Sequence, residues 1–241
     1  GAPKQSAEFD LSKIAALNIN ADPVCEEGPV NPKALCVLGS FFLTREIEMS
    51  LAVVGNFRVR EGPTGPEVEW RLPVSKTDPR AVSVTRTWKC LCQSTRVVPC
   101  PAHTAVDHLG ELMTRFACDG VLPDSLPLFP TVSGATTDKA KVVRTLECLA
   151  EMYGASLTDD LGRRAFGGHS FRISGSRMLA SMGIELYKIA LLARWASNII
   201  MRYVSEAPLV TLSEDCRRLL DGADTDRVLD ELRCELREEP C

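Results

Sequence analysis

The chain has 241 residues, 45% hydrophobic and 25% charged, as is ordinary for a soluble globular protein with one large domain or two small ones. It has no apolar run of about eighteen residues and no visible secretory signal, so we expect no membrane span and no secretion. Its ten cysteines therefore indicate reduced thiols in an intracellular protein rather than a disulfide framework.

The net charge of −4 hides a strong alternation along the chain. Residues 58–96 hold 8 basic and 4 acidic side chains, and residues 163–205 hold 7 and 1, whereas the segments around them are acidic. Because a local positive field attracts a polyanion whatever the total charge, these two blocks are the expected surface for a nucleic acid.

Residues 1–30 combine Pro, Gly and polar residues with a short apolar pattern at Leu11, Ile14 and Leu17, which predicts a linker with a brief helix. The chain begins with Gly rather than Met. We therefore expect this segment to be the trailing end of an upstream domain that the sequence does not contain.

From residue 31 to residue 54 apolar residues dominate, and Pro32 stands where the first turn of a helix tolerates proline, so one or two buried helices are predicted. Arg45 and Glu48 lie three residues apart in this stretch. They fit a surface ion pair, which would contribute less than about 1 kcal/mol. Their apolar surroundings favour burial instead, and a buried Arg requires a partner.

Between residues 56 and 88 the apolar period changes from that of a helix to that of a strand. The alternating stretches are 57–60, 68–72 and 82–86. Clusters rich in Gly, Pro, Thr and Asp separate them and predict turns, so we expect a three-stranded antiparallel meander. Lys76 lies at the tip of its second hairpin, where most lysines are simply solvated.

Cys90, Cys92, Cys100 and His103 form the pattern C-x-C followed by C-x-x-H. Four such ligands suffice for a closed structural zinc site, which would fix the exit of the sheet to a helix that begins near residue 104. The spacing is not that of a standard zinc finger. A group of reduced structural cysteines is the alternative.

Two further helices are predicted at 106–118 and 139–153 from apolar residues at helical spacing, the second with an N-cap candidate at Asp138. A proline-rich connection with the sequence Leu-Phe-Pro at 128–130 joins them. We predict a packing role for this whole region.

His169 and Arg172 open the next helix one turn apart, so both side chains are expected on the same face. An apolar run over 184–192 follows and ends at Arg194 and Trp195. Arg can hold two phosphate oxygens bidentately, and His and Trp each add a donor, so these groups suit phosphodiester chemistry.

A phenol can attack a phosphodiester and hold the covalent intermediate, and the chain has three tyrosines. Tyr187 falls in the apolar run, where core packing explains it, and Tyr153 is the other competitor. Tyr203 follows Arg202 after a polar break, which is consistent with a short, movable helix, and its position eight residues after Trp195 makes it the predicted nucleophile. The alternative is an ordinary tyrosine of an amphipathic helix.

The chain turns acidic after residue 206, with 5 basic and 11 acidic side chains over 206–241. Apolar residues recur at helical spacing, so 213–241 is predicted to be an amphipathic helical tail. An acidic tail does not favour DNA, so we expect it to fold back on its own chain or to dock on a neighbouring protomer.

H-x-x-R, then Trp, then Tyr eight residues later resembles box II of the tyrosine recombinase or phage-integrase family. The form R-W-x-S-x-x-x-x-R-Y, which ends at Tyr203, looks most like the DIRS and crypton-like recombinases of eukaryotic transposons. The R-x-x-E of Arg45 and Glu48 matches box I of this family, and Lys76 lies where the family has a hairpin-tip lysine.

The resemblance implies an α+β, mainly α-helical catalytic domain over residues 31–212 with a small three-stranded antiparallel sheet. It implies DNA cleavage by transesterification without a metal, cofactor or ATP, leaving a 3′-phosphotyrosyl link and a free 5′-hydroxyl. The implied catalytic residues are Arg45, Lys76, His169, Arg172, Trp195 and Tyr203, supported by the acid Glu48. The implied DNA-binding residues are Arg45, Lys76, Arg172, Arg177 and Arg202.

In this scheme the arginines clamp the non-bridging oxygens of the phosphate, His169 and Trp195 complete the clamp, and His169 is a candidate acceptor of the tyrosine proton. Lys76 is the general acid toward the leaving oxygen. The expected partners are double-stranded DNA and other copies of the chain in a DNA-bound assembly, with no membrane and no small-molecule substrate. The transposon likeness implies a mobile-element origin and a nuclear location.

Three other functions remain open. A type IB topoisomerase shares the chemistry, but would relax supercoils without a partner protomer. A catalytically silent descendant would serve as a DNA-binding module. An unrelated helical scaffold would require the motif matches to be accidental.

Overall fold

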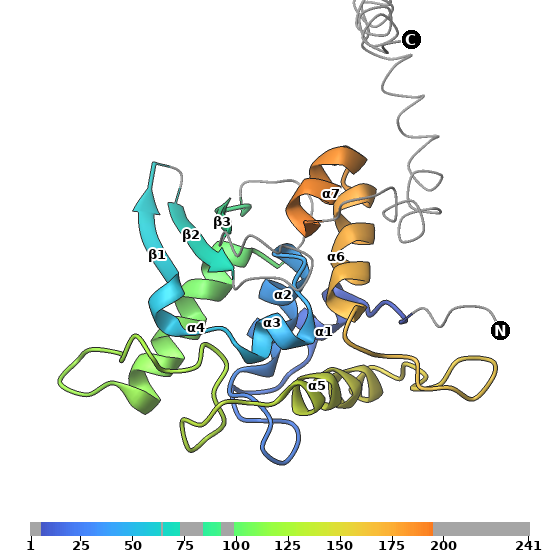
Figure 1. The fold of residues 1–241 in the computed structure, drawn as a ribbon, viewed down its shortest axis with the longest axis horizontal. Coiled ribbons are helices and arrows are strands. Elements are labelled where there is room, and N and C mark those ends of the chain that lie inside the picture. Colours follow the sequence, from blue (N-terminus) through green and yellow to red (C-terminus); the bar gives the residue numbers. More distant parts are fainter. Residues whose placement is uncertain (1–5, 64, 73–83, 93–98, 195–241) are drawn as a thin grey trace, which may run out of the picture.

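The computed structural model describes residues 6–63, 65–72, 84–92 and 99–194 (Figure 1). Within them the helices are α1 (Leu11–Ala16), α2 (Pro32–Phe41), α3 (Glu46–Ser50), α4 (Pro101–Phe116), α5 (Lys139–Met152), α6 (Ser170–Ser181) and α7 (Leu186–Ala193). The strands are β1 (Phe57–Gly62), β2 (Gly65–Leu72) and β3 (Val84–Lys89), with a 3-10 turn over Val54–Asn56. The mainly helical architecture with a small sheet is as predicted. None of the helices in this part of the chain is long and apolar enough to cross a membrane.

The sheet is the antiparallel meander expected from the alternating stretches, in the order β1-β2-β3. Phe57 pairs with Trp70 in the first hairpin, and Val68 pairs with Trp88 in the second. Trp70 is fully buried because its face of the sheet packs against α4 and the core. Gly65 begins β2 with φ +115°, a conformation that glycine adopts readily, so the first turn closes tightly.

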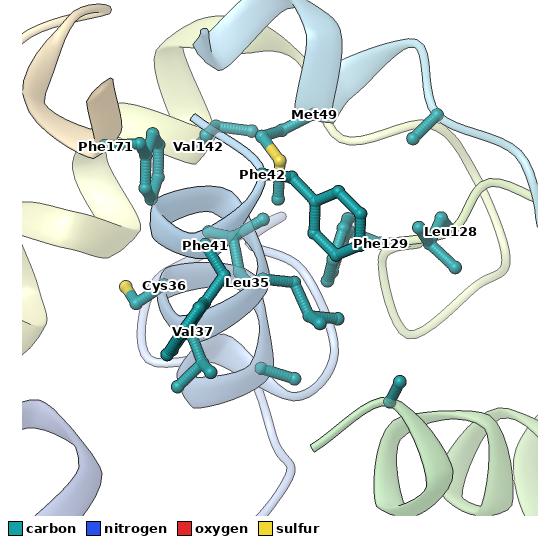
Figure 2. Close-up of a cluster of buried hydrophobic side chains, with 14 of the residues drawn as sticks. Leu35, Cys36, Val37, Phe41, Phe42, Met49, Leu128, Phe129, Val142 and Phe171 are labelled. Carbon is teal, nitrogen blue, oxygen red and sulfur yellow. The ribbon is translucent and has the colours of Figure 1, made fainter. Parts of the chain in front are cut away.

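Helix α2 is the centre of the core (Figure 2). The Asn31 side chain caps its N-terminus by accepting from the backbone of Ala34, and Pro32 occupies its first turn. Because α2 is apolar on all sides, it is stable only when surrounded. The helices α1, α4, α5 and α6 all pack on it.

Two glycines let α6 approach α2 closely. A Cβ at Gly175 would overlap the backbone oxygen of Ser40, and a Cβ at Gly39 would lie 2.8 Å from the ring of Phe171. This approach places the first turn of α6 against the loop that follows α2. The same loop leads into α3, so three segments meet at one point.

Residues 6–30 contain the predicted brief helix, α1, and they also contribute to the core. Phe9 and Ile14 are buried, and the backbone N–H of Phe9 donates to Oγ of Ser174 on α6 at 2.8 Å. Residues 6–30 are therefore part of the packed core and not only a linker. The domain boundaries at residues 30 and 212 stay predictions.

Side chains from neighbouring segments hold the Leu-Phe-Pro stretch by donating to its backbone carbonyls, in line with the expected packing role. Nε2 of His108 donates to the carbonyl of Leu128 at 2.7 Å, and the hydroxyl of Thr137 donates to the carbonyl of Phe129 at 2.9 Å. The His108 ring also stacks on Phe129, with ring centroids 4.8 Å apart. Helix α5 starts at the predicted cap, where the Asp138 carboxylate accepts from the next turn.

Candidate active site

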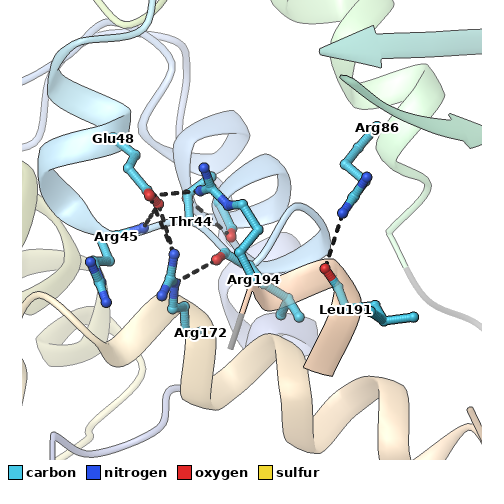
Figure 3. A network of polar contacts seen from close by, with 9 residues as sticks. Thr44, Arg45, Glu48, Arg86, Arg172, Leu191 and Arg194 are labelled. Carbon is cyan, nitrogen blue, oxygen red and sulfur yellow. Dashed lines mark hydrogen bonds and ion pairs between the residues drawn. The ribbon is translucent and has the colours of Figure 1, made fainter. Parts of the chain in front are cut away.

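Glu48 is the centre of a cluster of arginines from three segments (Figure 3). It is only 2% exposed. Its Oε2 lies 3.1 Å from Nη2 of Arg172, and its Oε1 lies 2.6 Å from Nη2 of Arg194. Oε2 also accepts the backbone N–H of Arg45 at 2.7 Å. One carboxylate cannot neutralise three guanidinium groups, so the cluster carries a net positive charge.

The spacing of Arg45 and Glu48 is explained by the start of α3. Arg45 is the N-cap residue, and Glu48 at the third helical position reaches back to its N–H, which is one half of a capping box. The surface ion pair considered for these residues is wrong, because Glu48 is buried. The expectation of burial is correct for Glu48, whose partners come from α6 and the end of α7, whereas Arg45 is only half-buried.

Arg172 is 1% exposed and is held on two sides. Its Nε donates to the carbonyl of Leu43 at 2.7 Å, and its Nη2 donates to both oxygens of Glu48, at 3.3 and 3.1 Å. Leu43 has φ +49°, a left-handed conformation that costs a non-glycine residue about 1–2 kcal/mol. The residue with this unfavourable backbone conformation is the one whose carbonyl accepts the hydrogen bond from Arg172.

Buried donors of this cluster lack an acceptor among the residues that the structure describes. They include Nη1 of Arg172 and Nε of Arg45. A buried N–H without an acceptor costs about 1–3 kcal/mol, more for a charged group, so an anionic acceptor from outside would bind here favourably.

Arg194 was not among the candidates from the sequence. It ends α7 in the left-handed conformation, with φ +59°, and its side chain is 11% exposed against Glu48. Nη2 of Arg86 on β3 donates to the carbonyl of Leu191 at 3.0 Å, which ties α7 to the sheet. The available signal was the Arg next to Trp195 in the box II string, but its partner Glu48 is 146 residues away.

The electrostatics leave Arg172 charged and favour the neutral form of His169. Burial lowers the pKa of Arg172 to about 10, with Glu48 opposing the shift and Arg45 and Arg194 adding to it. Arg172 therefore stays protonated at neutral pH. Desolvation of part of the ring, with the charges of Arg45 and Arg172, lowers the pKa of His169 below 6.5. A neutral imidazole can accept a proton.

His169 is the exposed N-cap residue of α6, one turn before the buried Arg172. The two residues therefore differ in burial although they share one end of the helix. Gly168 lies against the carboxylate of Glu46, so α3 meets the chain here as it enters α6. The backbone N–H of Glu46 also points to the carbonyl of Gly168 at 3.4 Å.

The structure thus brings together four of the predicted residues, namely Arg45, Glu48, His169 and Arg172. Arg177 is ion-paired with Glu8 at 2.7 Å, and its contact with DNA stays a prediction. The remaining candidates lie outside the described residues, as does the tail over 213–241; they are Lys76, Trp195, Arg202 and Tyr203. The side chains of Cys90, Cys92, Cys100 and His103 converge at the start of α4.

The chain has the fold of a tyrosine recombinase catalytic domain. It superposes on the XerH site-specific recombinase bound to palindromic difH substrate in a post-cleavage complex, with a TM-score of 0.58 and 13% identity over 91% of this chain and 54% of XerH. The pre-cleavage complex of XerH with difH gives 0.54 and 16%, over 80% and 47%. A lambda integrase dimer bound to a COC′ core site gives 0.52 and 11%, over 85% and 61%.

No protein-family model matches the sequence, and no curated protein does. The chain spans about half the length of the XerH chains that it resembles. Likeness at 11–16% identity shows the fold alone.

Proposed function

We propose that this chain is the catalytic part of a site-specific DNA recombinase or integrase, and that the arginine cluster around Glu48 binds the phosphate to be cleaved. The observation that carries this proposal is a buried, net positive cluster with donors of Arg45 and Arg172 left without an acceptor. A phosphodiester offers the missing negative charge and two non-bridging oxygens. The DNA-bound recombinases that share the fold support the same reading.

In the proposed reaction the hydroxyl of Tyr203 attacks the phosphorus, and the bond from phosphorus to the 5′ oxygen breaks. The product is a 3′-phosphotyrosyl link and a free 5′-hydroxyl. Because the link keeps the energy of the phosphodiester, a second 5′-hydroxyl can reverse the step and exchange strands. The reaction consumes no nucleoside triphosphate.

Each group has a separate task in this proposal. Arg45 and Arg172 hold the non-bridging oxygens, whose charge grows in the transition state, and such preorganised donors usually supply the largest rate term. His169 accepts the phenol proton, and its lowered pKa keeps it available at neutral pH. Lys76 donates a proton to the leaving oxygen, and Trp195 completes the clamp.

The proposal extends to origin and assembly. The box II string ending at Tyr203 supports an origin in a eukaryotic mobile element, and hence a nuclear location. Recombination requires several active sites on one DNA, so other copies of the chain are the expected partners. The basic blocks at 58–96 and 163–205 are the expected contact with the duplex.

Covalent trapping tests the proposal. The chain is mixed with nicked duplex DNA carrying the termini of its own element, or with a pooled library, and the denatured mixture is examined for a protein band shifted by covalent DNA. The wild-type chain is expected to form this band. Tyr203→Phe is expected to bind DNA without forming it, because the nucleophile is gone.

The matched control is Tyr187→Phe. Tyr187 lies on α7 and is 58% exposed, so the core packing predicted for it is wrong. This change should leave the band intact. A band that survives Tyr203→Phe would refute the nucleophile. Relaxation of a supercoiled plasmid by isolated protomers would instead support a topoisomerase. DNA binding with no band would support a silent DNA-binding module.

A further inference from the structure

A second group of reactive side chains lies at the junction of the sheet and α4, away from the arginine cluster. Cys90 and Cys92 follow β3, Cys100 is the N-cap residue of α4, and His103 lies in the first turn of that helix. One ligand atom from each lies within 4.8 Å of every other. Folding thus brings together two pairs that are separated along the chain.

The three distances from the His103 nitrogen to the sulfurs match those of a tetrahedral metal site. Nδ1 of His103 lies 3.6 Å from the sulfur of Cys90, 3.3 Å from that of Cys92 and 3.4 Å from that of Cys100. With Zn–S bonds of about 2.3 Å and Zn–N bonds of about 2.0 Å, the edge from sulfur to nitrogen of a tetrahedron is about 3.5 Å. The observed edges scatter around this value.

Hydrogen bonding alone does not account for the arrangement. A ring nitrogen carries either one N–H or one lone pair, so Nδ1 of His103 cannot bond to three thiols at once. Backbone N–H groups also point at the sulfurs, from Leu91 to Cys100 at 3.2 Å and from Cys92 to Cys90 at 3.4 Å. Such donors stabilise the thiolate form, which is the form that binds a metal.

We propose that Cys90, Cys92, Cys100 and His103 bind one zinc ion in a closed structural site. Three thiolates and an imidazole are the soft and borderline ligands that zinc prefers over magnesium or calcium. All four positions of the tetrahedron are filled by the protein, so no position is left for water or substrate. The site does not depend on the proposed recombination chemistry.

The place of the ion indicates what it stabilises. It joins the end of β3 to the start of α4, and Cys90 also packs on Gly65 at the start of β2, where an added Cβ would lie 3.2 Å from the Cys90 side chain. Further along β3, Nε1 of Trp88 donates to the carbonyl of Phe41 at 3.1 Å. The ion would therefore fix the strand that also contacts α2 and, through Arg86, α7.

The test is metal analysis of the full chain, expressed with added zinc and purified without a chelator. The wild type is expected to hold about one zinc per chain, and Cys92→Ser less than about half of that, because a closed site needs all four ligands. Cys118→Ser is the matched control, since Cys118 is also an exposed thiol but lies outside the group. It should retain the wild-type zinc content.

If the Cys92→Ser chain fails to fold, a second measurement on the wild-type chain still tests the proposal. Cobalt(II) exchanged into the wild-type chain should give the thiolate charge-transfer and tetrahedral absorption bands of a sulfur-rich site. A chelator should lower the melting temperature of the wild type. Soluble, folded wild-type protein with less than about half an equivalent of zinc, a different bound metal, or an octahedral cobalt spectrum would each overturn the proposal.

Discussion

Arg194 occupies an unusual position for an arginine, because it combines a left-handed backbone with a nearly buried charge. Glycine is the residue that normally ends a helix in this conformation. The backbone cost of about 1 kcal/mol is offset here by the ion pair with Glu48. Substitutions at this position can separate the two contributions.

We expect Arg194→Gly and Arg194→Ala both to slow adduct formation, since both leave Glu48 with one partner fewer. The free energy of unfolding should differ, with the Gly variant more stable than the Ala variant by about 1 kcal/mol, because only Gly adopts the backbone without strain. Urea unfolding of the two variants measures this difference. An Ala variant as stable as the Gly variant would contradict the left-handed conformation.

A single site residue can be predicted from the sequence when it belongs to a short local pattern. Arg45 and Glu48 are three residues apart and His169 and Arg172 are also three apart, so short motifs reveal them. The importance of Arg194 arises from a partner 146 residues away. No local spacing contains that information.

Helix α6 approaches α2 through a glycine contact beside the buried ring of Phe171. Gly175 faces the backbone of Ser40 on α2, and it lies one turn after Arg172 on the same helix. The distance between the two helices therefore determines whether Arg172 reaches Leu43 and Glu48. This dependence can be tested without changing any polar group.

We expect Gly175→Ala to destabilise the fold by about 1–3 kcal/mol, because the added Cβ must push α2 and α6 apart. It should also slow covalent trapping. Gly110→Ala, in α4, is the matched control, because a Cβ there meets nothing within 4 Å. It should be neutral or stabilising by about 0.5–1 kcal/mol. Equal unfolding free energies for the two variants would contradict the close helix contact.

The elements themselves follow from local periodicity, which is why the helices and strands are predicted well. Their ends are less certain, since they depend on capping. Helix α4 begins at Pro101 rather than near residue 104 or at residue 106, as predicted, because Cys100 acts as its N-cap and proline fits the first turn. Strand β3 continues to Lys89 and so reaches the proposed zinc ligands.

For the whole molecule, the most informative buried group outside the site is His108. Its ring lies wholly inside the core between Leu128 and Phe129. Burial lowers its pKa to about 4, only partly opposed by the bond to Leu128 and the charge of Glu111. The folded protein therefore keeps this imidazole neutral over a pH range in which the unfolded chain protonates it.

The sign of the effect follows directly. Between pH 6.5 and about 4 the unfolded chain binds the extra proton at His108, so the folding stability falls as the pH falls. We expect this group to cost about 2 kcal/mol at pH 5 relative to pH 7.5. Urea unfolding at both pH values should show a smaller loss for His108→Gln, which can donate to Leu128 and does not titrate. An identical pH dependence in both chains would contradict the buried neutral histidine.

The N-terminal segment shows why the extent of the packed unit is hard to predict from sequence. Its Pro and Gly content is typical of a linker, yet the backbone N–H of Ala7 donates to the carbonyl of Ala165 at 2.7 Å, and Phe9 packs edge-on against Phe171 at 5.7 Å. These partners lie more than 150 residues away. Composition is a local property of the segment, whereas its burial depends on tertiary contacts with distant parts of the chain.

Because Glu48 is shared among three segments, the residues around it are expected to change at different rates during evolution. Arg172 and Glu48 are both buried, and losing Glu48 would leave the charge of Arg172 uncompensated in the core, which costs about 3–5 kcal/mol of stability. His169 is exposed, and its loss would cost the fold little. In a lineage that abandons DNA cleavage, selection for folding alone would preserve the buried pair while the histidine drifts. Under the proposed function, the histidine would therefore report among relatives of this chain whether catalysis was kept, and the buried pair would not.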